Sequence, residues 1–196
     1  MMCKILKEDV RTSHIPIILL TAKDSLQDKE EGYQVGADSY LTKPFSATLL
    51  HSRINNLLES RKRLTERFNT STPHHNMDEK RALLAESLNK LDNEFIEKIN
   101  QLIEARLSSE KIDIGYLADN MCMSKSTLYR KMKALTGLST NEYVRKIKMQ
   151  HAERLLLEGR YNISEVAFRV GINSVVYFRQ CFKEEFGVLP SEYLKQ

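Results

Sequence analysis

The sequence has few cysteines and no arrangement of them that binds metal. Its three cysteines, Cys3, Cys122 and Cys181, are an odd number and form no C-x-x-C pair. Neither a disulfide framework nor a zinc site is therefore expected, and we predict buried or half-buried free thiols. No apolar run approaches the length of a bilayer span, and the N-terminus has no basic-then-apolar signal pattern. We predict a cytoplasmic protein without membrane insertion.

Residue constellations that support catalysis are also lacking. The sequence contains no nucleophile paired with a base, no cluster of metal ligands and no glycine-rich phosphate loop. His74 and His75 are adjacent, but neighbouring histidines in a loop are more often solvent-facing than metal ligands. We predict that the protein is not an enzyme and needs neither a cofactor nor a metal.

Charge is distributed unevenly along the chain, although the net charge is only +4. Ser124–Arg160 contains nine Lys or Arg against three Asp or Glu, whereas Met1–Ser60 contains seven against eight. A basic cluster on predicted helices is typical of a surface that binds a polyanion. A solvated helix face has the same pattern, so charge alone does not decide between the two. The basic residues are Lys125, Arg130, Lys131, Lys133, Arg145, Lys146, Lys148, Arg154 and Arg160.

The N-terminal section, residues 1–63, alternates strand and helix signals. Ile15–Leu20 is a short apolar run with β-branched residues, as in a buried parallel strand, and Ser39–Thr42 predicts a second strand. Ser25–Val35 and Ser46–Arg63 predict helices. This section therefore has the pattern of a small α/β domain.

A linker separates this section from a helical one. Asn69–Met77 has no hydrophobic periodicity, and we place the linker over residues 64–91. From Asp92, a predicted N-cap, the pattern is helical, and an apolar stripe begins at Phe95. Residues 92–196 are therefore predicted to form an all-α domain.

The helical section contains an internal repeat. Six residues between Leu128 and Tyr143 recur 50 positions later, between Phe178 and Tyr193. Upstream, Leu117-Ala118 recurs as Val166-Ala167 at an offset of 49, so the second copy has one more residue in its turn. Self-similarity at a fixed offset indicates a duplicated structural unit.

Each copy has the pattern of a helix-turn-helix unit. The small Ala118 and Ala167 allow two helices to approach closely, and Gly171 suits a turn position with positive φ. A glycine, Gly137 or Gly187, ends each second helix. The first copy is predicted as a helix over 114–120, a turn over 121–123, a cap at Ser124 and a helix over 125–136. The second is predicted as 163–170, 171–173, a cap at Asn173 or Ser174, and 175–186.

The second helix of each copy has a buried face and an outward face. Val175 and Val176 are unusual on an outward face: they fit contact with thymine methyl groups, and packing against the final helix fits them equally well. The predicted buried residues are Leu128, Met132 and Leu135 in the first copy, and Phe178, Cys181, Phe182 and Phe186 in the second. The outward residues are Ser126, Tyr129, Arg130 and Lys133, then Val175, Val176, Arg179, Gln180 and Lys183.

A long predicted helix, Thr140–Glu158, joins the two copies. At about 1.5 Å per residue it spans about 28 Å, close to the ~34 Å between successive major-groove faces of B-DNA. Its Arg145, Lys146 and Lys148 are predicted to meet the intervening phosphates. The predicted fold is mainly α, with two helix-turn-helix units joined by a long helix.

Residues 112–196 resemble the DNA-binding domain of AraC/XylS-type regulators. The resemblance implies base-edge contacts at seven positions and departs from the family at two, where Cys122 replaces a turn glycine and Leu189 replaces Ser or Thr. The stretches that carry it are Leu117-Ala118, Ser124–Gly137, Ile163–Gly171, Tyr177–Gly187 and Pro190–Tyr193. The implied base contacts are Ser126, Tyr129, Arg130, Val175, Val176, Arg179 and Gln180; Lys125, Lys133, Ser174 and Lys183 complete the predicted DNA-binding set.

Residues 1–63 resemble the second half of a response-regulator receiver domain, in the stretches His14–Lys23 and Gly36–Phe45. The resemblance implies that Thr21 binds a phosphoryl group, that Tyr40 is a switch aromatic and that Lys43, before a cis proline, pairs with a phosphoaspartate. The acidic pair and the acceptor aspartate of a receiver would precede residue 1, and we expect a truncated receiver that accepts no phosphoryl group. Three aspartates lie on the wrong side of the strands for that role: Asp24, Asp28 and Asp38.

The favoured hypothesis is a transcription regulator that binds double-stranded DNA at the output end of a two-component phosphorelay. RNA polymerase and a second copy of the chain are further candidate partners. The alternative is a signalling module whose incomplete receiver half associates with another protein, since the edges of an incomplete sheet are open to pairing.

Overall fold

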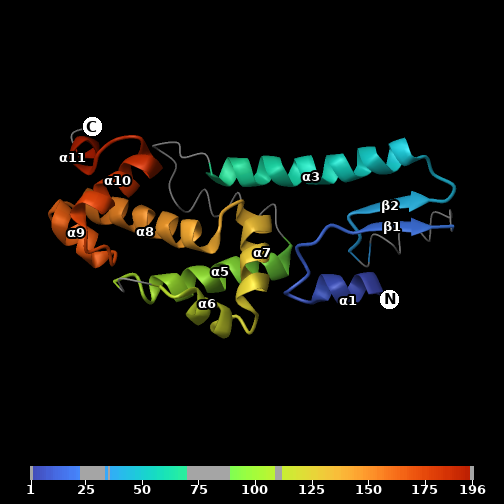
Figure 1. Cartoon of the computed structure of the whole chain (residues 1–196), viewed down its shortest axis with the longest axis horizontal. Coiled ribbons are helices and arrows are strands. Elements are labelled where there is room, and N and C mark those ends of the chain that lie inside the picture. The colour runs from blue at the N-terminus through green and yellow to red at the C-terminus, as the bar shows by residue number, and fades with distance from the viewer. Residues whose placement is uncertain (1, 23–33, 35, 70–88, 109–111, 195–196) are drawn as a thin grey trace.

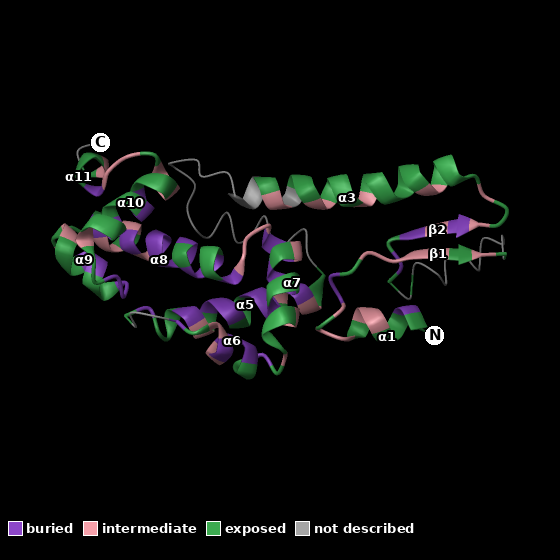
Figure 2. Ribbon diagram, in the orientation of Figure 1, coloured by how far each residue is buried: buried purple, intermediate pink, exposed green. Residues whose placement is uncertain are grey.

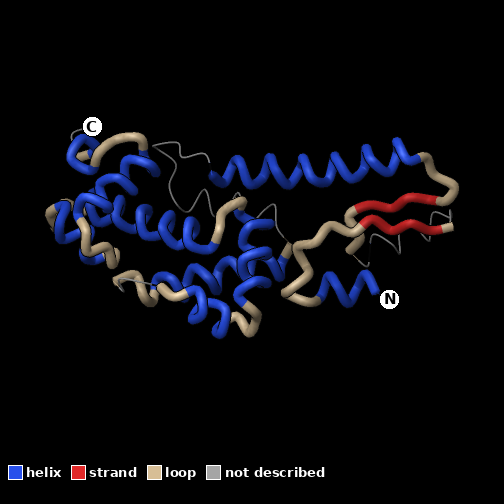
Figure 3. The backbone as a smooth tube through the Cα atoms, in the orientation of Figure 1, coloured by secondary structure: helices blue, strands red, loops and turns tan. Residues whose placement is uncertain are grey.

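The computed structural model describes residues 2–22, 34, 36–69, 89–108 and 112–194 of the 196-residue chain. These residues form an elongated, mostly helical molecule (Figures 1 and 3). An N-terminal segment, residues 2–69, lies at one end with a parallel strand pair. The two predicted helix-turn-helix units follow, and the second lies at the other end. The mainly α class predicted from the sequence is confirmed.

The N-terminal segment begins with α1, Met2–Glu8, a helix that the sequence reading did not predict. Two strands follow, β1 at Ile18–Thr21 and β2 at Ser39–Thr42. They pair in parallel, with Ile18 opposite Ser39 and Thr21 opposite Thr42. The prediction that the first strand is buried and begins at Ile15 was wrong. Most of β1 is half-buried and Leu20 is 44% exposed. The reason is that, among the described residues, β1 pairs only with β2.

Helix α3, Ala47–Asn69, extends past the predicted end at residue 63 and runs back along the molecule toward the second unit (Figure 1). Its predicted apolar stripe is present, but much of the stripe faces solvent (Figure 2). Leu49, Ile54 and Leu58 are 44%, 37% and 57% exposed. The predicted helix over 25–35 and the linker over 69–77 lie almost entirely outside the described residues.

The first helix-turn-helix unit is α6, Ile114–Asn120, and α7, Lys125–Thr136. Helix α5, Lys90–Glu104, packs beneath it in the same hydrophobic core. The prediction that Asp92 caps α5 was wrong. Asn89 is the cap and its side chain accepts the backbone N–H of Asp92, while Asp92 itself is buried in the first turn.

The long helix α8, Thr140–Leu157, runs from the first core into a second one. Its N-terminal half contributes Val144 and Ile147 to the first core, and its C-terminal half contributes Ala152 and Leu156 to the second. The second unit, α9 at Ile163–Arg169 and α10 at Val175–Phe186, completes that core with the short α11, Pro190–Tyr193. Because α8 belongs to both cores, it links the two units rigidly.

The turns of the two units have matching backbones. Cys122 and Gly171 occupy the same place in the repeat, and both have positive φ, 53° and 66°. The next residue in each turn, Met123 or Ile172, donates its N–H to the carbonyl of the small alanine in the preceding helix, at 3.0 Å and 2.9 Å. The predicted duplication is therefore visible in the hydrogen bonds of the turn.

Candidate nucleic-acid interface

Helix α7 is capped at both ends and presents one polar face. The Ser124 hydroxyl accepts the N–H of Thr127 at 3.1 Å, and Gly137 ends the helix at φ 73°. Leu128, Met132 and Leu135 are buried, as predicted from the helical period. The described structure leaves the predicted DNA-binding residues of this helix exposed: Lys125, Ser126, Tyr129, Arg130 and Lys133.

Helix α10 repeats this arrangement with Ser174, not Asn173, as its cap: the Ser174 hydroxyl accepts the N–H of Tyr177 at 3.3 Å. Val176 is 77% exposed, which excludes its packing against α11, whereas Val175 is half-buried. Phe186, predicted to be buried, is only partly so, since it lies at the edge of the core. The exposed candidates on this helix are Ser174, Val176, Arg179, Gln180 and Lys183.

The basic residues of α8 do not form the phosphate-facing surface that their sequence suggested. Lys146 and Lys148 are each 5% exposed. The Lys146 amine pairs with Glu185 on α10 at 3.3 Å, and the Lys148 amine donates to the carbonyl of Gly171 at 3.2 Å. Burial lowers the pKa of Lys148. Of the three, only Arg145 stays at the surface, 3.6 Å from Glu184.

These internal lysines have a positional role. Lys146 fastens α8 to α10, and Lys148 fastens α8 to the carbonyl of Gly171, in the turn that precedes α10. A third basic residue of the predicted cluster, Lys131 on α7, is also completely buried. The basic cluster of the sequence therefore divides into surface residues that are free to meet a polyanion and buried ones that hold the two units in place.

One tyrosine anchors each unit, and the two tyrosines, Tyr143 and Tyr193, occupy equivalent positions in the repeat. The Tyr143 hydroxyl donates to the Asn100 side chain on α5 at 2.9 Å, and the Tyr193 hydroxyl donates to the Glu153 carboxylate on α8. Burial, together with Glu153, raises the pKa of Tyr193. Each hydroxyl is satisfied by the helix that precedes its own unit, so neither tyrosine is available to a ligand.

An open groove of about 740 Å³ lies between the N-terminal half of α8 and the turn of the second unit. Arg145, Asn173 and Tyr177 line it beside the cap Ser174. Tyr177 was not among the predicted DNA-binding residues, although its position three residues after the cap places it in the first turn of α10. It is 49% exposed and adds an aromatic surface beside the predicted DNA-binding residues.

Two of the three residues of the receiver resemblance, Thr21 and Lys43, lie at the C-terminal end of the strand pair, whereas Tyr40 lies within it. Thr21 ends β1, Tyr40 lies within β2, and Lys43 follows β2 with its N–H donating to the Thr21 carbonyl at 2.7 Å. Lys43 precedes the cis proline that the resemblance implied. Asp38 directly precedes β2, at the N-terminal end of the strand pair, and pairs with Lys7 at 2.6 Å, as expected for an aspartate on the wrong side of the strands.

None of the three cysteines forms a disulfide, and they differ in exposure: Cys3 and Cys181 are buried and Cys122 is exposed, against the prediction for Cys122. Among the residues described, none of the helices combines the length and the apolar character that a bilayer span requires. His74 and His75 lie outside the described residues.

Two family models match this chain. Residues 117–196 match the helix-turn-helix domain, and residues 1–55 match the response regulator receiver domain. Histidine kinase P4 from Formosa agariphila is 35% identical over 192 residues, 98% of this chain and 14% of that protein. The DNA-binding dual transcriptional regulator Rns from Escherichia coli is 32% identical over 99 residues, 50% of this chain and 37% of that protein.

A solved structure matches about half of this chain. The C-terminal domain of AraT, a response regulator from Geobacillus stearothermophilus, is 31% identical and covers 52% of this chain and 84% of that chain, with a TM-score of 0.48. This chain spans 14% of the length of histidine kinase P4 and 37% of the length of Rns. The match to P4 covers both the N-terminal and the C-terminal part of this chain.

Proposed function

We propose that residues 117–196 are an AraC-type helix-turn-helix domain, that they follow a receiver segment at residues 1–55, and that this chain is a transcription regulator that binds double-stranded DNA in a sequence-specific manner. One observation carries the proposal. Both second helices, α7 and α10, seal an apolar face in separate cores and leave a polar face open to solvent. A single rigid helix, α8, holds the two at a fixed separation.

The residue types on these faces suit the grooves of DNA. Arg130 and Arg179 offer planar guanidinium groups, which bond bidentately to the O6 and N7 atoms of guanine in the major groove. Gln180 suits adenine, and the exposed Val176 suits a thymine methyl group. Lys125, Lys133 and Lys183, with the hydroxyls of Ser126 and Ser174, suit phosphate contacts that position the protein without reading sequence.

Domain assignment and partners belong to the same proposal. We assign residues 1–63 to the receiver segment, 64–91 to the linker and 92–196 to the DNA-binding domain, at the output end of a two-component phosphorelay in the cytoplasm. RNA polymerase and a second copy of this chain are proposed as further partners. We propose no enzymatic activity for it.

Selection from random duplex DNA, followed by quantitative binding, tests the proposal. A motif should be enriched, and Arg130→Ala or Arg179→Ala should weaken binding by about 1–3 kcal/mol, roughly 5–150-fold, with relaxed preference at one position. Lys133→Ala should weaken binding to all sequences alike and reduce the salt slope by about one. Arg53→Ala, an exposed arginine on α3, is the matched control and should change neither. An absence of any enriched motif overturns the proposal.

The exposed apolar residues of α3 favour a second candidate function, association of the N-terminal segment with another protein. Leu49, Ile54 and Leu58 are all more than one-third exposed on one helix, and Leu20 adds to them on β1. Light scattering across a concentration series tests self-association, one form of this function. A Leu58→Lys change should shift any dimer toward monomer, and a monomer at all concentrations would argue against self-association.

A further inference from the structure

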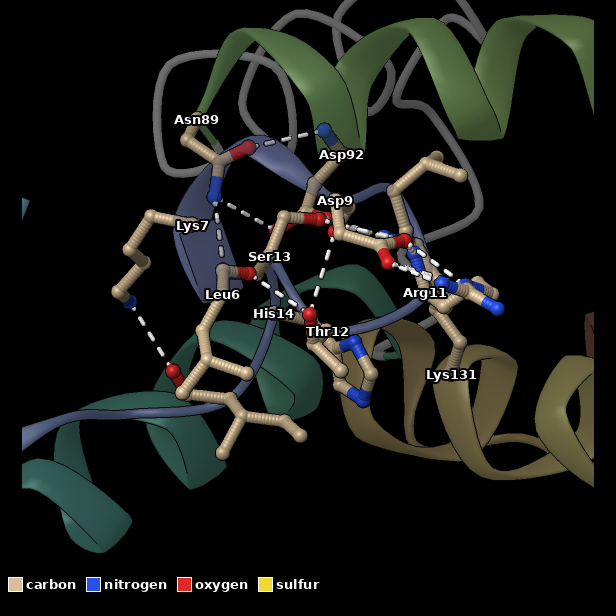
Figure 4. Close-up of polar contacts among 12 residues, drawn as sticks. Leu6, Lys7, Asp9, Arg11, Thr12, Ser13, His14, Asn89, Asp92 and Lys131 are labelled. Atoms are coloured by element: carbon tan, nitrogen blue, oxygen red, sulfur yellow. Dashed lines mark hydrogen bonds and ion pairs between the residues drawn. The ribbon is translucent and has the colours of Figure 1, made fainter. Parts of the chain in front are cut away.

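A buried polar cluster connects the N-terminal segment to the first reading helix (Figure 4). The Lys131 ammonium on α7 donates to the Asp92 carboxylate on α5 at 2.5 Å, to the Ser13 hydroxyl at 2.8 Å and to the Val10 carbonyl at 2.5 Å. These three bonds use all three protons of the ammonium. Two of its three partners belong to the loop that joins α1 to β1, residues 9–17, which we call the α1–β1 loop.

The cluster is sealed and internally satisfied. Lys131 and Ser13 are 0% exposed and Asp92 is 2% exposed. The Ser13 hydroxyl donates a hydrogen bond to one oxygen of the Asp92 carboxylate at 2.7 Å, and the Asn89 side chain donates to the other oxygen at 2.8 Å. A charge in such a site is tolerated only when its partners are in place, because removing one leaves a buried group unpaired. The α1–β1 loop is therefore a required partner of the lysine.

The internal repeat shows that a helix-turn-helix unit does not need a lysine at this position. The residue 50 positions later in the second unit is Cys181, an uncharged residue that is 2% exposed and belongs to the second hydrophobic core. The neighbouring core positions are apolar in both units, Leu128 with Phe178 and Met132 with Phe182. At this position of the repeat, the buried charge is therefore present only in the unit that contacts the N-terminal segment.

A second contact holds the same loop from the other side. The Arg61 guanidinium on α3 donates to the carbonyl of His14, the residue after Ser13. Within the loop, the N–H groups of Thr12 and Ser13 donate to the Asp9 carbonyl at 2.9 Å and 2.8 Å. The loop is therefore a compact turn held between α7 and α3, and its own amide hydrogen bonds report on whether it is closed.

We propose that the α1–β1 loop docks specifically on α7 through Lys131, so that the N-terminal segment sets the position of the first reading helix and leaves the second unit unaffected. The docking itself is independent of DNA. Its consequence for binding rests on the proposed function: contacts of α7 with DNA respond to the state of the N-terminal segment, while contacts of α10 do not.

Hydrogen exchange on the full chain without DNA tests the docking. Lys131→Met, which keeps the length of the side chain and removes its charge, should speed exchange of the Thr12, Ser13 and Ile15 amides by about tenfold or more, since they would exchange by local opening. Amides of α10 should keep their rates. Lys133→Met, an exposed lysine on the same helix, is the control and should change none of these. Loop rates within about twofold of the unsubstituted chain would overturn the proposal.

Ser13→Ala keeps the test decisive if Lys131→Met unfolds the whole domain. It removes one hydroxyl from the α1–β1 loop and leaves the Lys131–Asp92 pair in place. Loop amides should again exchange several-fold faster with α10 unchanged, and unchanged loop rates would refute the docking.

Footprinting on an enriched DNA motif then tests the consequence. Lys131→Met should reduce protection in the half-site read by α7 and leave the half-site read by α10 unchanged. Equal loss in both halves, or in neither, would contradict selective coupling to the first unit. If no motif is enriched at all, the proposed function fails, while the exchange result on the docking stands by itself.

Discussion

Replacing Cys122 with glycine should stabilise the protein. Cys122 has φ 53°, a left-handed conformation that costs a residue with a Cβ roughly 1–2 kcal/mol. Glycine removes this strain, but it loses more conformational entropy on folding, which lowers the free energy of unfolding by about 0.5–1 kcal/mol. The Cys122 side chain is exposed, so little packing is lost with it. The net expectation is a gain of about 0.5–1 kcal/mol in the free energy of unfolding.

Urea unfolding followed by circular dichroism measures this gain, and a melting temperature about 1–4 °C higher should accompany it for a chain of this size. The reciprocal change in the second turn, Gly171→Ala, should destabilise by about 1 kcal/mol or more, since φ is 66° there and the residue is buried. Binding to an enriched DNA motif should be unaffected by Cys122→Gly, because neither reading face changes. An unchanged or lower stability for Cys122→Gly would refute the assignment of strain to this turn.

Two further predictions concern a helix cap and a buried histidine. Leu189 occupies the N-cap of α11, but its side chain has no hydrogen-bond acceptor. Leu189→Ser should therefore add about 0.5–1 kcal/mol to the free energy of unfolding, because the serine hydroxyl can accept a backbone N–H of the first turn. Urea unfolding measures this gain, and a loss would show that the apolar contacts of Leu189 matter more. Burial, reinforced by the charges of Lys131, Arg61 and Lys7 and opposed by Asp92, lowers the pKa of His14 to about 4. The unfolded chain, with a histidine pKa near 6.5, therefore binds the proton first, and stability should fall by about 1–2 kcal/mol as the pH drops from about 6.5 to 4, after allowance for solvent screening. His14→Gln should flatten this fall, and an equally steep profile in the variant would assign the acid sensitivity to other groups.

The helix-turn-helix plan could be predicted from the sequence because its determinants are local. A small alanine at the helix contact, a turn residue that tolerates positive φ, a serine cap and a terminal glycine each constrain one backbone position. All but the turn residue appear twice at nearly the same spacing: that residue is Gly171 in the second copy and the strained Cys122 in the first. The strand at Ser39–Thr42 was predicted to the residue for a related reason: its ends are marked by the Gly36–Asp38 turn and by Pro44.

The number of basic residues in a segment does not predict which lysines are buried, because a count of charges does not distinguish the faces of a helix. The helical period contains the missing information. Lys131 lies three residues after Leu128 and four before Leu135, and therefore on the core side of α7. Lys148 lies midway between Val144 and Ala152, which are both buried. What the period cannot supply is the partner, since Asp92 and Ser13 are 39 and 118 residues away in the chain.

The two units therefore differ in what fixes them, although they share one backbone plan. The second is fastened to α8 by Lys146, which pairs with Glu185 on α10, and by Lys148, which bonds to Gly171 in the turn before α10. The first is fastened through Lys131 to a loop at the other end of the chain. A rearrangement of the N-terminal segment would strip Lys131 of two of its three hydrogen-bond partners while every polar contact of the second unit persisted. The fold thus makes the first reading helix the element able to respond to that segment, and the second a constant anchor.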